Sequence, residues 1–194
     1  MSNREWDATQ TAVLDAVIAC ANESGFRSLT TRRVAEVAGV NEVTIFRRFG
    51  SKAQLIAAAF EREASEIGAQ VGEYTGDLHA DLERIVAAIW NAAGRRRLTI
   101  PVILSELATN EELRAAAGHS MNMVGKVAAI LARYQNDGLL VKEPPLLAHA
   151  SLVGPLVFLG IVSRLLPEPP AVDIADHVRR FLEGHATGPL KKEK

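Results

Sequence analysis

The sequence predicts an all-α protein in which a three-helix helix-turn-helix domain is followed by a larger helical bundle. Apolar residues recur at the spacing of one helix face, as at Leu14, Val17, Ile18 and Ala21. The alternation of apolar and polar residues that marks strands is not found, and neither are short hairpin turns between apolar runs. The chain has 194 residues, of which 48% are hydrophobic, so it can bury a sizeable core.

Four helices are expected in the first third of the chain. Gly25, Gly39 and Gly50 separate them, because glycine stops a helix and tolerates the positive φ of a tight turn. Thr30 or Thr31 can cap the second helix, and the third and fourth have their own caps in Asn41 and Ser51. The expected ranges are 7–24, 32–38, 41–49 and 52–68.

Five further helices follow, which makes about nine in total. The expected ranges are 78–93, 98–109, 111–136, 146–166 and 174–184. Asp77 and Asn110 are suitable N-caps, and Pro155 is expected to kink its helix. We expect a DNA-binding domain over residues 1–52 and a ligand-binding and dimerisation domain over residues 53–194.

Charge is concentrated near the second and third helices. The whole chain has 22 basic and 23 acidic side chains, a net charge of −1. Residues 26–52 hold six basic and two acidic side chains, so this segment carries +4 and the remainder −5. Such a patch attracts a polyanion at one place on the surface, although composition alone favours an ordinary solvated charged surface.

Residues 32–49 have the pattern of a helix-turn-helix, two short helices joined at Gly39. The residues expected to pack them together, and onto the first helix, are Val34, Ala35, Ala38, Val40, Ile45 and Phe49. We also place Val37 on the inner side of the second helix. Val43, Phe46 and Arg47 are then left on one free face of the third helix, which is what entry into a major groove requires.

The segment LTTRRVAEVAGVNEVTIFRRFGSKAQL, residues 29–55, resembles the DNA-binding signature of TetR-type transcriptional regulators. The similarity is greatest over VNEVTIFRRFGSK, residues 40–52, and extends over about the first 60 residues. It implies a homodimer whose third helices enter major grooves of a near-palindromic operator. It also implies a C-terminal domain that dimerises and holds a small-molecule effector, whose binding releases the DNA.

The resemblance implies a set of DNA contacts around the third helix. These are Thr31, Arg32, Glu42, Val43, Thr44, Phe46, Arg47, Arg48 and Lys52. Arg47 can contact guanine O6 and N7, and Val43 a thymine methyl group. Glu42 can accept a hydrogen bond from cytosine N4 or hold Arg47 or Arg48 in place. Phe46 stands where the family often has tyrosine, so a hydroxyl contact to phosphate is lost.

The middle helices carry residues suited to a mostly apolar ligand pocket. The candidates are Trp90, Leu104, His119, Met121, Met123, His149 and Phe158, although each also fits an ordinary core or surface position. The expected effector is an apolar or amphipathic molecule.

The last two helices are expected to form the dimer interface, through Leu152, Leu156, Leu159, Val178 and Leu182. The helix over residues 146–166 is apolar nearly all round, which demands extensive burial. It has the length of a membrane helix, but its polar residues favour a protein interface. The alternative is that it forms the centre of the subunit's own bundle.

Other functions receive little support from the sequence. It contains none of the common hydrolase, nucleotide-binding or dinucleotide-binding motifs and no Cys/His cluster for zinc, so we expect no enzyme, metal or cofactor. One cysteine and a polar N-terminus lead us to expect a cytoplasmic protein. We therefore predict a repressor that a small effector releases from its operator. The alternatives are a helical small-molecule-binding protein or an enzyme with an incidental basic patch, and an architectural DNA-binding protein.

Overall fold

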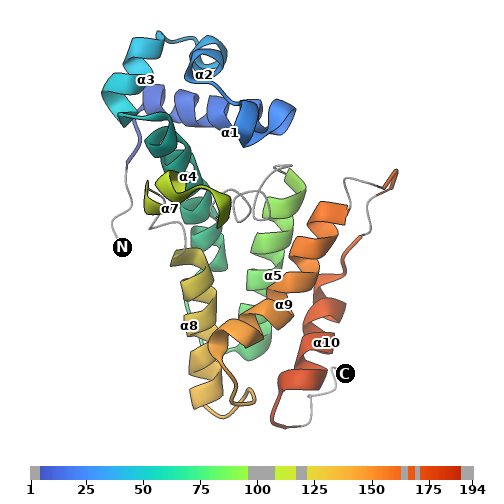
Figure 1. Ribbon diagram of the computed structural model, residues 1–194. Helices are drawn as coiled ribbons and strands as arrows, with labels where there is room; N and C mark the ends of the chain where they lie inside the picture. Colours follow the sequence, from blue (N-terminus) through green and yellow to red (C-terminus); the bar gives the residue numbers. More distant parts are fainter. Residues whose placement is uncertain (1–4, 96–107, 117–121, 163–165, 169–170, 189–194) are drawn as a thin grey trace. The chain divides into compact units, whose positions relative to one another are not determined.

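The structure, a computed structural model, describes residues 5–95, 108–116, 122–162, 166–168 and 171–188 (Figure 1). This part of the chain contains nine helices and no strand, which confirms the all-α prediction. The helices are α1 (Ala8–Ser28), α2 (Thr31–Ala38), α3 (Glu42–Phe49), α4 (Lys52–Val71), α5 (Leu78–Arg95), α7 (Glu111–Ala116), α8 (Asn122–Asn136), α9 (Pro145–Val162) and α10 (Ile174–His185).

These helices form two compact units. Unit 1 contains α1, α2, α3, α7 and the part of α4 up to Ser65. Unit 2 contains the remainder of α4 together with α5, α8, α9 and α10. The first unit thus continues beyond residue 52 into α4, which contributes to both units.

Unit 1 is built around the buried faces of α1 and α4. Phe26 packs edge-to-face on Phe60 in this core, with ring centroids 4.9 Å apart. Gly25 has φ 79° and interrupts the helical conformation of α1, close to the predicted stop. Leu113 of α7 belongs to the same buried cluster.

The turn between α2 and α3 follows the predicted local signals. Thr30 rather than Thr31 caps α2, because its hydroxyl accepts from the amide of Arg33 at 3.2 Å. Gly39 takes a left-handed conformation with φ 68°, and the side chain of Asn41 accepts from the amide of Val43 at 2.9 Å. The prediction that Val37 lies on the inner side of α2 is wrong, because Val37 is exposed. Val34 and Ala35 fill the inner face instead.

Unit 2 packs α9 against α5 and α8, with α10 against α5. Leu139 to Val141 also lie beside the end of α10, where the amide of Val141 donates to the carbonyl of His185 at 2.7 Å. The helix predicted over 111–136 is described as α7 and α8, and residues 117–121 between them lie outside the described part. Of the helix predicted over 98–109, only residues 108–109 are described, and they are helical.

Helix α9 is continuous through Pro155 from Pro145 to Val162. By length and composition it is the one helix in the described ranges that could span a membrane, which by itself is weak evidence. Ala148, Leu152, Val153 and Leu156 on one side of it are buried in unit 2. The buried side of α9 thus belongs to the core of unit 2, which fits a helix of a protein bundle.

Candidate nucleic-acid interface

Helix α3 is fixed in unit 1 by two buried side chains, Ile45 and Phe49. Asn41 caps its start, and the amide of Gly50 donates to the carbonyl of Phe46 at its end. Because the two anchors lie four residues apart, they occupy one face of the helix and leave the opposite face to solvent.

The free face of α3 carries Val43, Phe46 and Arg47. Val43 is 71% exposed and Phe46 is 47% exposed, and Arg47 is exposed as well. Exposure of two large apolar side chains to water costs free energy in the isolated protein. Together with the neighbouring arginine, these side chains suit contact with another molecule. The side chain of Thr44, which lies between them in sequence, is half-buried.

Glu42 in the first turn of α3 is held by Thr31 of α2. The Thr31 hydroxyl donates to Glu42 Oε1 at 2.5 Å, and both side chains are half-buried. This bond joins the starts of the two helices and orients the carboxylate. The partner of Glu42 is Thr31, so the structure gives no support to the role in which Glu42 holds Arg47 or Arg48. The other role, acceptance of a hydrogen bond from a cytosine, fits the second carboxylate oxygen, which can still accept.

Arg48 is turned toward the start of α1, where it pairs with Asp7. Asp7 also caps α1 by accepting from the amide of Gln10 at 2.8 Å. The backbone bond from Gln10 and the pairing with Arg48 lower the pKa of the Asp7 carboxyl. The sequence placed Arg48 at the DNA, but the structure gives it an acidic partner 41 residues away in the chain. Asp7 is thus a residue that sequence reasoning missed in this region, although its D-x-x-Q capping box was a visible signal.

Two further basic groups flank α3. Arg32 of α2 is exposed and lies 3.4 Å from Glu36, a surface pair that exchanges readily with a competing anion. Lys52 begins α4 directly after Ser51, whose hydroxyl accepts from the amide of Gln54 at 3.2 Å. A lysine beside the free amides of a helix start is an arrangement that binds phosphate.

The candidate ligand residues are only partly covered by the structure. Leu104, His119 and Met121 lie outside the described residues, whereas Trp90, Met123 and His149 are half-buried in unit 2. Phe158 is 62% exposed. Since an exposed side chain does not line a pocket enclosed by one subunit, Phe158 is corrected to a surface residue of α9.

His149 predicts a pH dependence of stability. Burial lowers its pKa from 6.5, because the charged ring is poorly solvated there. Below pH 6.5 the unfolded chain therefore binds more protons at this histidine than the folded chain does. The contribution of neutral His149 to the free energy of unfolding is complete above pH 6.5 and is lost as the pH falls toward the pKa of the folded state. The urea midpoint should fall between about pH 7.5 and about pH 5.5, and it should fall less in His149→Gln. An equal fall in both proteins would contradict the burial of this ring.

The residues predicted for the dimer interface need correction. Leu152, Leu156, Val178 and Leu182 are buried in the core of unit 2, and Leu159 is half-buried. Side chains already covered within one subunit cannot contact a partner. The alternative that the helix over residues 146–166 lies in the subunit's own bundle fits the burial of Leu152 and Leu156. The apolar residues of α9 that remain exposed are Leu146, Leu147, Phe158 and Ile161.

Comparison with known proteins agrees with this geometry. Residues 13–59 match the family model described as bacterial regulatory proteins, tetR family. This match begins within α1 and ends within α4, so it contains the whole of α2 and α3.

Curated relatives have names of the same kind. An uncharacterized HTH-type transcriptional regulator of Bacillus subtilis, YvkB, is 31% identical over 105 residues, which are 54% of this chain and 56% of YvkB. The chain thus spans about half the length of this relative. The HTH-type transcriptional repressor KstR of Rhodococcus jostii is 29% identical over 177 residues, which are 88% of this chain and 79% of KstR.

A solved structure shares the fold over nearly the whole chain. The fatty acid degradation regulator FadR of Bacillus halodurans superposes with a TM-score of 0.69 at 19% identity, and the match covers 93% of this chain and 95% of that chain. The likeness therefore includes the C-terminal helices, which the family model does not cover.

Proposed function

We propose that this chain, whose residues 13–59 match the family model of tetR-type bacterial regulatory proteins, is a regulator of that kind and controls transcription by binding a specific DNA sequence. The observation that carries the proposal is the free face of α3, where Val43, Phe46 and Arg47 are exposed at the end of a helix-turn-helix. A helix with such a face fits the major groove of B-DNA.

Base reading is assigned to the free face. Arg47 donates to O6 and N7 of a guanine, and Val43 contacts the methyl group of a thymine. Phe46 makes apolar contact with a sugar or a thymine methyl group. The oriented carboxylate of Glu42 accepts from the amino group of a cytosine, with Thr31 holding it rather than contacting the DNA itself.

Phosphate contacts are assigned to Lys52 and Arg32 on either side of α3. Arg32 can approach a strand by giving up its surface pair with Glu36, and half-buried Lys52 lies at the start of α4, where helix amides accompany it. Arg48 takes a lesser part, because the phosphate must compete with Asp7 for its guanidinium group.

The active form in this proposal is a homodimer that binds a near-palindromic operator. Leu147, Gly154, Phe158 and Ile161 follow the spacing of one helix face on the outer side of α9. Covering this face with the same face of a second copy would remove its apolar side chains from water and create a two-fold axis. The dimer then presents two copies of α3 to one stretch of DNA.

We further assign repression with release by a small effector. The name of the relative KstR supports the repressor mode. Half-buried Trp90, Met123 and His149 of unit 2 support an apolar or amphipathic effector, because methionine and aromatic rings adapt to such molecules. A cytoplasmic location accompanies this role.

The experiment that tests the proposal is a selection of bound fragments from genomic DNA, followed by gel shifts with the recovered palindrome. The wild-type protein should bind the palindrome far more tightly than a scrambled sequence of the same length, with an affinity that falls steeply between about 50 mM and about 200 mM salt. An architectural protein would bind both sequences alike. Failure to recover any DNA would favour a helical small-molecule-binding protein instead.

Lys52→Ala should lower the affinity for every DNA sequence by a similar factor. The change removes one phosphate contact in each subunit, so the slope of log affinity against log salt should become shallower by about one per subunit. Titrations of the palindrome and the scrambled sequence at several salt concentrations measure this. Lys142→Ala, at an exposed position in unit 2, is the matched control. A slope that Lys52→Ala leaves unchanged would remove Lys52 from the phosphate contacts.

A further inference from the structure

The basic patch of unit 1 is opposed by carboxylates that precede it in the chain. Residues 26–52 carry a net charge of +4, whereas residues 5–25 carry −4, so the two stretches together are neutral. A basic patch attracts DNA of any sequence, and acidic groups beside it weaken that attraction. The four carboxylates of residues 5–25 are Glu5, Asp7, Asp15 and Glu23.

Two of these carboxylates pair with arginines of the helix-turn-helix. Asp7, the N-cap of α1, accepts a hydrogen bond from Nη1 of Arg48 in the last turn of α3. Glu23 of α1 lies 3.7 Å from Arg33 of α2, which also lies 3.6 Å from Glu36. Arg33 thus keeps an acidic partner when Glu23 is removed, whereas removal of Asp7 frees Arg48.

Arg48 lies on the flank of α3 rather than on its free face. Successive residues of a helix are about 100° apart, so Arg48 is about 100° from Arg47 and about 160° from Phe46 around the axis. The flanks of a helix in the major groove face the phosphates that border the groove. The side chain of Arg48 is 29% exposed and that of Asp7 50%, so a phosphate can reach this pair and compete for the arginine.

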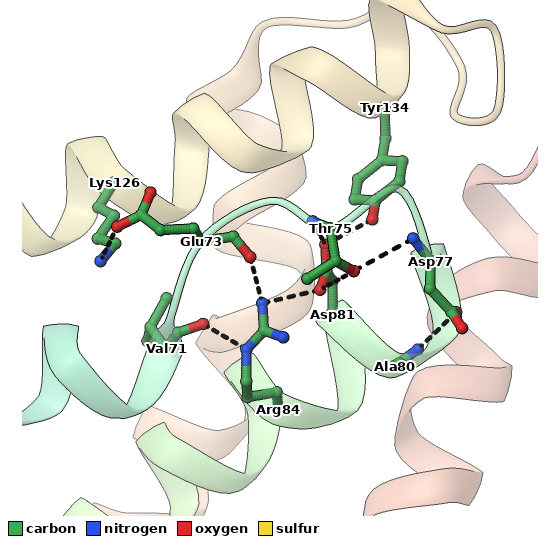
Figure 2. Close-up of polar contacts among 9 residues, drawn as sticks. All are labelled: Val71, Glu73, Thr75, Asp77, Ala80, Asp81, Arg84, Lys126 and Tyr134. Carbon is green, nitrogen blue, oxygen red and sulfur yellow. Dashed lines mark hydrogen bonds and ion pairs between the residues drawn. The ribbon is translucent and has the colours of Figure 1, made fainter.

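Figure 2 shows the opposite kind of ion pair, in unit 2. Asp81 is 0% exposed and accepts from the hydroxyl of Tyr134 at 2.6 Å and from the amide and hydroxyl of Thr75, both at 2.8 Å. Arg84 Nη2 lies 2.7 Å from the same carboxylate. An external anion cannot enter such a cluster in the folded protein, whereas it can compete for the pair of Asp7 and Arg48.

We propose that Asp7 is a specificity-determining residue, which occupies Arg48 and withholds this cation from the phosphates of DNA of any sequence. The inference rests on the proposed function, because it concerns the balance between specific and non-specific binding of DNA. Arg47 on the free face is not held in this way, so base reading is unaffected. Weaker non-specific binding leaves more protein free to reach a specific site among the many competing ones.

The two kinds of DNA respond differently to a freed Arg48. On non-specific DNA no base contact fixes the position of α3, so the protein can settle wherever the arginine gains a phosphate. On the palindrome the base contacts fix that position, and the freed arginine gains less. Removal of the Asp7 charge should therefore lower the ratio of specific to non-specific affinity.

The test compares Asp7→Asn with Glu5→Gln. Asparagine is as good an N-cap as aspartate, so Asp7→Asn keeps the hydrogen bond from the amide of Gln10 and removes the charge that holds Arg48. Glu5→Gln removes an equal charge from an exposed side chain two residues earlier and leaves the pair of Asp7 and Arg48 in place. The unfolding temperature of each variant, followed by circular dichroism, checks that it is folded.

Titrations of scrambled DNA and of the palindrome at several salt concentrations give the result. Asp7→Asn should bind scrambled DNA several-fold more tightly than wild type, and its slope of log affinity against log salt should be steeper by about one per subunit. The palindrome should gain less. Glu5→Gln should keep the salt slope and the affinity ratio of wild type.

Arg48→Gln in both backgrounds shows whether the gain comes from this arginine. The substitution should remove the gain from Asp7→Asn and should cost wild type several-fold less affinity for scrambled DNA. Equal costs in the two backgrounds would mean that Asp7 does not withhold Arg48, and the proposal would fail.

A pair that merely braces α3 against the start of α1 gives a different result. Asp7→Asn would then weaken binding to the palindrome and leave the salt slope on scrambled DNA unchanged, which would overturn the proposal. A selection that recovers no palindrome would defeat the proposed function alone, because titrations of scrambled DNA at low salt still report on Arg48. If Asp7→Asn binds scrambled DNA no more tightly than wild type there, this proposal is wrong as well.

Discussion

Arg47→Ala is expected to weaken binding to the selected palindrome by about 1–3 kcal/mol for each half-site and to relax the preference at one base position. Arg47 is exposed on the free face of α3, which it shares with Val43 and Phe46. Its planar guanidinium group can donate two parallel hydrogen bonds to one guanine, and alanine can donate neither. The loss should therefore be confined to specific DNA and small on scrambled DNA.

The measurement is a repeated selection from randomised half-sites, combined with titrations of the palindrome. Arg33→Ala is the control, since Arg33 is an exposed arginine of α2 that pairs with Glu23 and Glu36, and its removal changes the net charge equally. Arg47→Lys keeps the charge but not the paired donors, so it should behave more like alanine than like wild type. Equal losses on every sequence would refute base reading by Arg47.

Phe158→Glu is expected to convert the homodimer into monomers that retain their helical structure and lose the palindrome. Phe158 is 62% exposed in the single chain, so glutamate is tolerated there in a monomer. In a two-fold interface each substitution acts twice, and the lost burial of two phenylalanine side chains alone amounts to about 3–6 kcal/mol. Two charges placed in an apolar contact add further cost.

Sedimentation equilibrium and circular dichroism measure the two halves of this prediction. Leu139→Glu is the matched control, because Leu139 is an exposed leucine of unit 2 that lies before α9 rather than on its outer face. It should remain dimeric and bind the palindrome. A dimer that persists in Phe158→Glu would place the interface elsewhere.

The local features of unit 1 could be predicted from sequence because their causes are local. Thr30 and Asn41 accept from amides two or three residues away, and the amide of Gly39 donates to carbonyls three and four residues before it. The free face of α3 follows from the spacing of Ile45 and Phe49, which the periodicity alone reveals. A short amphipathic helix therefore shows its orientation in its own sequence.

Contacts between distant residues could not be predicted in the same way. Arg48 meets Asp7 across 41 residues, and Tyr134 meets Asp81 across 53 residues. Nothing in the sequence near either residue specifies its partner, because the approach depends on how whole helices pack. The buried contact between Tyr134 and Asp81 therefore had no counterpart among the predicted sites.

Helix α9 shows a second limit of prediction from sequence. It is apolar on nearly every side, so its sequence does not indicate which half faces its own subunit. Packing against α5 and α8 decides this by burying Leu152 and Leu156 and leaving Phe158 and Ile161 outside. The predicted helix was right, whereas the residues chosen from it for a partner belong to the opposite side.

The central claim is that the free face of α3 reads the major groove. Methylation interference on the selected palindrome tests it most directly, because a methyl group at guanine N7 blocks the major groove and one at adenine N3 blocks the minor groove. We predict that N7 methylation of one guanine in each half-site prevents binding by wild type and has no further effect on Arg47→Ala. Binding that tolerates every N7 methyl group but fails on N3 methylation would contradict the account.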